Sequence, residues 1–307
     1  MSELSSDRKA TILEEIAKSP DNINYTQIGK KHGAHRTTVR KLHLDWLTGR
    51  DRREVIAKHT KPYMKTLYVD TEVLPNKGYF YDTYNDKRPI PLDFVLQQKA
   101  IITIQYAFND DEPTVLIADE PYNDKDILAQ FQPITELADQ IIWHNGESFD
   151  RKILDARLFI NKLPPLPPVQ SIDTYKLAKA KFGRMLNSNG LAHLAKLCGV
   201  EDKGHVDART WAMVAEGDRD ALMDKVVPYA AQDVVTLRQI YKCLAPRIDT
   251  KTNHNLHTDS PVLLCKSCGS DDMRYVGLEY TAATFRHKYH CNNCMKYSTF
   301  PKTAKKP

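Results

Sequence analysis

Two carboxylates that share one face of a short strand are the first candidates for chemistry in this sequence. Asp70 and Glu72 stand two residues apart in the stretch YVDTE, where apolar and polar residues alternate as in a β-strand. Because side chains two apart on a strand point the same way, both carboxylates lie on one face. Neighbouring acids repel each other and resist burial unless a cation lies between them. The pair therefore predicts a metal site, with a solvated polar strand end as the alternative.

Two further acids follow in contexts that suit the same site. Asp150 ends the stretch HNGESFD, which comes directly after the apolar run 141–143 and leads into a helical pattern. Asp233 lies in YAAQDVVTLRQIY, four residues after Tyr229, and residues four apart on a helix project from one face. Taken singly, Asp150 could be an ordinary first-turn acid favoured by the helix dipole, and the Tyr229–Asp233 spacing could be incidental.

The elements that must position these acids alternate between strands and helices. Strands are expected at 100–108 and 114–118, a helix at 124–138, and a short buried strand at 141–143. Asp173 precedes a helical pattern and is predicted to cap it. This alternation predicts an α/β fold in which a mixed sheet is flanked by helices.

Together, the motifs VDTE, HNGESFD and YAAQD resemble, in this order, the three motifs of the DnaQ-like (ribonuclease H-like) 3′–5′ exonucleases. The tyrosine four residues before the last acid is similar to that of the DEDDy branch. The resemblance covers about residues 66–245 and is closest to phage-encoded ribonuclease H-like proteins that share LPPLPPVQSIDTYKLAK and a C-terminal four-cysteine module. It implies that Tyr229 orients the attacking water. The implied metal ligands are Asp70, Glu72, Asp150 and Asp233.

The chemistry expected from four acids agrees with that resemblance. Phosphodiester hydrolysis requires an activated water, stabilisation of transition-state charge and help for the leaving oxygen, which two divalent ions about 3.5–4 Å apart supply. Carboxylate oxygens suit Mg²⁺ or Mn²⁺. The sequence thus predicts a two-metal exonuclease that releases nucleoside 5′-monophosphates, with DNA as the expected substrate and the 3′–5′ direction implied by the resemblance. An exoribonuclease and a non-catalytic DNA-binding adaptor that retains the fold are the alternatives.

The N-terminal segment predicts a helix-turn-helix DNA-binding domain at residues 1–56. Apolar residues at helical spacing indicate three short helices, and Gly33 permits a tight turn between the second and the third. In such a domain the helix after the turn enters the major groove. A solvated basic face on three packed helices is the alternative. The candidate DNA-contacting residues are His35, Arg36, Thr37, Thr38, Arg40 and Lys41.

Four cysteines near the C-terminus predict a zinc ribbon at residues 261–301. Two CxxC pairs, separated by a β-ribbon pattern, supply four thiolates, which match the tetrahedral shell of one structural Zn²⁺. The predicted ligands are Cys265, Cys268, Cys291 and Cys294. The ribbon alternates aromatic and basic residues, so it could contact nucleic acid, or its aromatics could serve only as a small core. The polar residues 246–260 before it are expected to form a linker.

Charge is unevenly distributed along the 307 residues, whose net charge is +5. Residues 1–66 carry 14 Lys and Arg against 8 Asp and Glu, residues 67–250 carry 21 against 27, and residues 251–307 carry 9 against 4. An acidic middle between basic ends is typical of a metal-dependent catalytic domain, expected at 66–247, with nucleic-acid-binding appendages. The sequence contains neither an apolar signal core nor a run long enough for a membrane span, which predicts a cytoplasmic protein, in the host cell if phage-encoded.

Overall fold

The computed structural model describes residues 8, 11, 12, 15, 24–36, 38, 39, 42, 64–79, 91–200, 204–257 and 262–301. Its centre is a five-stranded sheet in the order β5-β4-β1-β6-β7. The strands are β1 (Thr66–Leu74), β4 (Ala100–Phe108), β5 (Thr114–Ile117), β6 (Gln140–Trp143) and β7 (Gln170–Asp173). The sheet is mixed, because β5, β4 and β1 pair antiparallel whereas β1, β6 and β7 pair parallel.

Strand β1 is the middle strand, and its two edges are paired unequally. Its antiparallel pairing with β4 runs from Leu67 to Leu74, with one bulge after Glu72. Its parallel pairing with β6 covers only Thr66 to Tyr68. Beyond Tyr68 the edge of β1 that faces β6 therefore needs other partners for its backbone groups.

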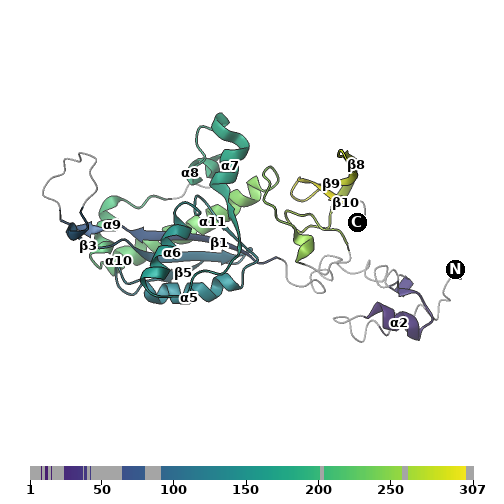
Figure 1. The fold of residues 1–307 in the computed structure, drawn as a ribbon, viewed down its shortest axis with the longest axis horizontal. Helices are drawn as coiled ribbons and strands as arrows, with labels where there is room; N and C mark the ends of the chain where they lie inside the picture. Colours follow the sequence, from purple (N-terminus) through teal and green to yellow (C-terminus); the bar gives the residue numbers. More distant parts are fainter. Residues whose placement is uncertain are drawn as a thin grey trace.

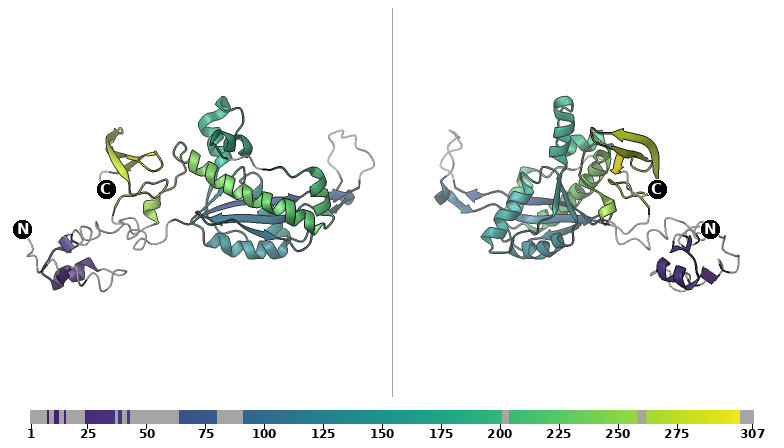
Figure 2. Two further views of the ribbon diagram at one scale, coloured as in Figure 1. Left: turned by 180° about the vertical axis from the view of Figure 1, so that it is seen from behind. Right: turned by 45° about the vertical axis from the view of Figure 1, so that its right-hand side comes forward.

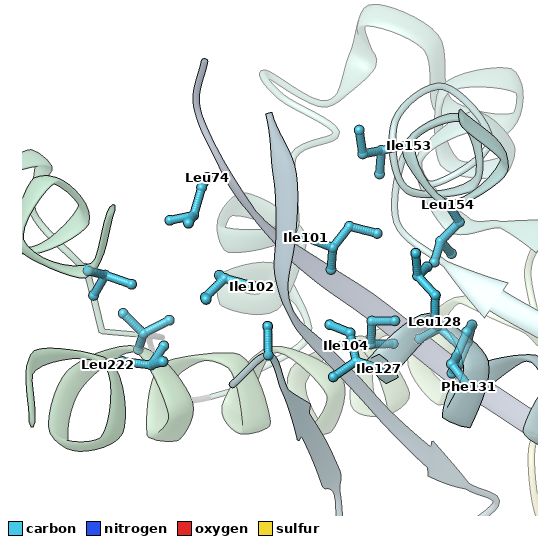
Figure 3. Close-up of a cluster of buried hydrophobic side chains, with 14 of the residues drawn as sticks. Leu74, Ile101, Ile102, Ile104, Ile127, Leu128, Phe131, Ile153, Leu154 and Leu222 are labelled. Carbon is cyan, nitrogen blue, oxygen red and sulfur yellow. The ribbon is translucent and has the colours of Figure 1, made fainter. Parts of the chain in front are cut away.

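Helices cover both faces of this sheet. On one face, Leu67 and Val69 of β1 share a core with α5 and α6; on the other, Tyr68 packs against Leu237 and Tyr241 of α11. Figure 1 and Figure 2 show α11 crossing the face opposite to α5 and α6, and Figure 3 shows apolar side chains of the larger core. These helices are α5 (Lys125–Glu136), α6 (Asp150–Ile160) and α11 (Val227–Leu244). This alternation of faces is what the period-two pattern of β1 requires.

The remaining described elements of this sheet domain are shorter. The segment after β1 holds β2 (Lys77–Gly78), η1 (Leu92–Phe94) and β3 (Val95–Gln97). Beyond β7, the chain forms α7 (Thr174–Phe182), η2 (Gly183–Met185), α8 (Leu191–Leu197), α9 (Ala208–Ala215), α10 (Arg219–Ala221) and the π-helical turn η3 (Leu222–Val226). Helices α7 and α8 project from the sheet domain as a pair (Figure 1).

A linker is predicted from the sequence at residues 246–260, but residues 246–257 pack against the rest of the chain, and residues 258–260 lie outside the described part. Thr252 is 6% exposed and donates to the side chain of Gln140, and Thr250 is also buried. A short helical turn, η4 (His254–Leu256), follows, and Asn255 exchanges hydrogen bonds with the backbone of Leu264. Polar residues here are bound to their neighbours rather than solvated, so composition alone misplaces them.

The C-terminal unit is a three-stranded antiparallel sheet in the order β10-β9-β8. Its strands are β8 (Met273–Tyr280), β9 (Phe285–Cys291) and β10 (Tyr297–Pro301). The β-ribbon predicted between the cysteine pairs is therefore confirmed as β8 and β9. Lys296 anchors this sheet to α11, because its ammonium donates to the carbonyls of Ala245 and Ile248 at 2.9 and 2.8 Å.

At the N-terminus, α2 (Tyr25–Lys31) is followed by Gly33 with φ +59°, a left-handed turn that suits glycine. Ile12, Ile28 and Val39 pack together as a small core. Residues 36, 38, 39 and 42 are helical, while residues 48–63 lie outside the described part of the chain. Across all described residues, no helix combines the length and hydropathy that crossing a membrane requires.

Candidate active site

The two acids of β1 stand on the sheet face that α11 covers. Asp70 and Glu72 alternate with Val69 and Thr71, and both are partly exposed, whereas Val69 is fully buried. The predicted common face is therefore confirmed. The strand supports them because its first four residues, Thr66 to Val69, are buried in the two cores.

Gln105, which sequence reasoning missed, fixes the orientation of Asp70. It lies directly opposite Asp70 in the β1–β4 register, and its amide donates to the Asp70 carboxylate at 2.7 Å. Thr103 in turn donates to the Gln105 side-chain oxygen at 3.0 Å. Gln105 is 0% exposed, and a glutamine in the mostly apolar run AIITIQYAF is the signal that could have identified it.

Asp150, at the start of α6, meets the open edge of β1. The backbone N–H and the hydroxyl of Thr71 both donate to one Asp150 oxygen, at 3.1 and 2.6 Å. The parallel pairing with β6 ends at Tyr68, so this carboxylate provides the hydrogen bond that a neighbouring strand would have provided. Thr71 is thus a second positioning residue that the sequence did not indicate.

Asp233 and Tyr229 come from α11, one helical turn apart. Asp233 is 4% exposed and lies among the residues of α11 that face the sheet, next to Val234 and Leu237. Tyr229 is half-buried and packs against the larger core. A π-helical turn, η3, immediately precedes this helix, and wide turns of this kind recur at functional sites.

The structure brings three of the four predicted acids into one cluster. Carboxylate oxygens of Asp70, Glu72 and Asp233 lie within 4.8 Å of one another. Asp150 stands outside this set because Thr71 holds its carboxylate, yet its charge still acts on Asp70. Hard oxygen ligands in such a cluster fit Mg²⁺ or Mn²⁺.

The electrostatics of the cluster also favour a cation. Burial raises the pKa of Asp70 well above its ordinary value, and the charges of Asp150, Glu72 and Asp233 raise it further. Burial likewise raises the pKa of Asp150, while the hydrogen bonds from Thr71 oppose that rise. Neighbouring carboxylates repel each other when both are ionised. A bound divalent cation offsets this repulsion and favours their ionised forms.

The loop that leads to Asp150 is fixed by Asp173. As predicted, Asp173 caps α7, accepting from the backbone N–H of Lys176. It also accepts from the backbone N–H groups of Asn145 and Glu147, at 3.0 and 3.2 Å. The buried carboxylate therefore connects the end of β7 to the turn between β6 and α6.

A cavity of about 370 Å³ opens beside Tyr229. Its lining comes from the segment before α9, the first turn of α9, η3 and the start of α11. The residues around it are Gly204, His205, Val206, Asp207, Thr210, Lys225, Pro228, Tyr229 and Gln232. This hollow adjoins the first half of the helix that carries Asp233, and its lining includes Tyr229 and Gln232 but none of the four acids.

The four predicted zinc ligands also come together. The sulfur atoms of Cys265, Cys268, Cys291 and Cys294 lie within 4.8 Å of one another. The Cys265–Cys294 and Cys268–Cys291 sulfur distances are 3.6 and 3.7 Å. A tetrahedron with Zn–S bonds of about 2.3 Å has edges of about 3.8 Å, so the cluster fits one zinc ion.

The predicted DNA-contacting residues are described in part. His35 and Arg36 are exposed at the start of the helical residues after Gly33, and Thr38 is half-buried. Thr37, Arg40 and Lys41 lie outside the described residues.

Comparison with known proteins gives one family match, within the central domain. Residues 95–245 match the RNase_H_2 family, described as RNase_H superfamily. The five-stranded mixed sheet flanked by helices is consistent with a ribonuclease H-like fold. No curated protein matches the sequence.

Among solved structures, 101 chains match. One is described as the structure of the family B DNA polymerase from the hyperthermophilic archaeon Pyrobaculum calidifontis, with a TM-score of 0.47 and 19% sequence identity. The alignment covers 60% of this chain and 25% of that chain, so the present chain spans about a quarter of the polymerase's length.

Proposed function

We propose that this chain, whose residues 95–245 form a domain of the RNase_H superfamily, is a metal-dependent 3′–5′ exonuclease of the DEDDy type. The observation that carries the proposal is the cluster of Asp70, Glu72 and Asp233, with oxygens within 4.8 Å of one another. Asp150 completes the acid set of the three motifs at the neighbouring edge of β1.

Each side chain of the site has a separate proposed role in phosphodiester hydrolysis. The four acids would hold two Mg²⁺ or Mn²⁺ ions, which would supply Lewis acidity for phosphodiester hydrolysis. Gln105 keeps Asp70 in its ligand orientation through the 2.7 Å hydrogen bond. Tyr229 orients the attacking water through its hydroxyl rather than removing its proton.

DNA is the proposed substrate, and nucleoside 5′-monophosphates are the proposed products. The support for DNA is the basic N-terminal segment, proposed as a helix-turn-helix with His35, Arg36, Thr37, Thr38, Arg40 and Lys41 as its contacts. Exposed His35 and Arg36 suit that role. A structural Zn²⁺ held by the four cysteines completes the proposed three-part organisation.

The test uses 5′-labelled single-stranded DNA and a matched RNA, with Mg²⁺ or with EDTA. We expect a Mg²⁺-dependent ladder on DNA that shortens from the 3′ end. Asp233→Asn should abolish it, while Asp224→Asn, which removes an exposed acid in η3, should cleave at the wild-type rate.

Cleavage of RNA alone would replace the DNA assignment with an exoribonuclease. No cleavage of either polymer, with binding retained, would support a non-catalytic adaptor. Full activity of Asp233→Asn would contradict the metal site itself.

A further inference from the structure

One face of the C-terminal sheet gathers basic and aromatic side chains. In the register of the three strands, Arg274, His290 and Tyr297 form a cross-strand row. Two residues further along β9, Lys288 follows on the same face, and then Arg286. Among the described residues none of these three cations is in an ion pair.

This basic face is the outward one, because the opposite face forms the core of the unit. There Cys291, Tyr289 and Phe300 are buried together with Leu263 and Met273. On the basic face, in contrast, Arg274 and Arg286 are exposed. Its one acid among the described residues is Glu279, which stands opposite Arg286 at the far end. The face is therefore cationic along most of its length.

The aromatic side chain on this face is exposed and held in place. Tyr297 is 61% exposed, and its ring lies 4.7 Å from that of His290, centroid to centroid. His290 is 7% exposed and supports the tyrosine from beneath. An exposed ring with a fixed orientation beside unpaired cations is the arrangement with which proteins stack unpaired bases and follow a phosphate backbone.

The basic face is fixed relative to the carboxylate cluster. Lys296, next to Tyr297, binds the carbonyls of Ala245 and Ile248 just after α11, and α11 also carries Asp233. The twelve residues from Asp233 to Ala245 span about 18 Å along the helix axis. At about 3.4 Å per nucleotide of a stacked strand, that separation corresponds to about five nucleotides.

We propose that the basic face (Arg274, Arg286, Lys288, His290 and Tyr297) binds single-stranded nucleic acid several nucleotides from the bond at the carboxylate cluster. This inference rests on the proposed nuclease function and adds a second contact for the same strand. The cations bind phosphates, and Tyr297 stacks on a base. Short oligonucleotides reach the carboxylates alone, whereas longer ones engage both surfaces.

The test measures fluorescence anisotropy of labelled single-stranded DNA of about 4 and about 16 nucleotides in an Asp233→Asn background without added Mg²⁺. Arg274→Gln combined with Lys288→Gln should weaken binding of the longer strand and lower its salt slope by about 1.4, since each single-strand phosphate contact contributes about 0.7. Tyr297→Leu should weaken it about tenfold. Lys125→Gln with Lys152→Gln, two exposed lysines of α5 and α6, is the matched charge control.

Binding of the shorter strand should be the same in all variants, and zinc content should show that the ribbon variants are folded. Affinity and salt slope of the longer strand equal to those of the charge control would overturn the proposal. So would an equal loss for both lengths, or a loss seen only with duplex DNA. Because binding is measured without catalysis, absence of cleavage in the wild-type protein would refute the nuclease function and leave this result interpretable.

Discussion

Replacing Asp70 with asparagine tests how much the repulsion among the clustered carboxylates destabilises the metal-free protein. At 4.8 Å and an effective dielectric constant of about 20, two unit charges repel by roughly 3.5 kcal/mol. Asp70 faces two such partners, Glu72 and Asp233. Its raised pKa means that protonation already relieves part of this repulsion. We therefore expect Asp70→Asn to stabilise the metal-free protein by about 2 kcal/mol, less than one full pair.

The hydrogen bond from Gln105 survives this change, because the asparagine side chain keeps an acceptor oxygen. In thermal unfolding without divalent ions, about 2 kcal/mol corresponds to a Tm roughly 4–8 °C higher for a domain of this size. Added Mg²⁺ should raise the Tm of the wild-type protein by ligand linkage and that of Asp70→Asn by less.

Asp224→Asn, which alters an exposed acid outside the cluster, controls for the loss of a negative charge. A metal-free Tm of Asp70→Asn equal to or below that of the wild type would refute the calculated repulsion. An undiminished Mg²⁺ response would show that Asp70 is not a ligand.

Three further outcomes follow from the same structure. Because the pKa of Asp70 is raised in the folded protein, the folded state binds its proton more readily than the unfolded chain, so metal-free stability should fall as pH rises from the ordinary aspartate range through the raised pKa; melts over a pH series that begins in that ordinary range should show this, with a flatter profile for Asp70→Asn. Arg157→Met leaves the Asp124 carboxylate, which is 0% exposed, without its cationic partner. It should lower the free energy of unfolding in urea by about 3–5 kcal/mol, and adding Asp124→Asn to the same chain should restore part of that loss. Cys268→Ser should remove zinc and unfold the C-terminal sheet, measured by metal analysis and proteolysis, whereas Cys198→Ser, outside the cluster, should keep zinc; retention of zinc by the first variant would contradict the four-cysteine site.

Local patterns predicted the elements that carry the acids. The alternation around Asp70 indicated β1, the apolar run before HNGESFD indicated β6, and the helical spacing around Asp233 indicated α11. Each of these signals lies within about one element of the sequence, where periodicity is informative. The grouping of Asp70, Glu72 and Asp233 was also predicted, although only through the order of motifs taken together.

The contacts that orient the acids could not be predicted in the same way. The Gln105–Asp70 hydrogen bond depends on the register between β1 and β4. The hydrogen bond from Thr71 to Asp150 depends on where the pairing between β1 and β6 ends. Register is set by which faces are buried across the whole sheet, and no short window contains it. For the same reason composition suggested a linker at 246–260, where Thr252 is buried against Gln140.

Helix α11 connects these findings, because it serves the carboxylate cluster and the C-terminal sheet at once. The ammonium of Lys296 binds the carbonyl of Ala245, which caps the C-terminus of this helix, and that of Ile248 just beyond it. A cation at this end also complements the helix dipole. The C-terminal sheet thus acts as a cap for the helix that holds Asp233 in its first half. We therefore expect loss of the C-terminal sheet to destabilise the carboxylate cluster as well as the proposed strand-binding face.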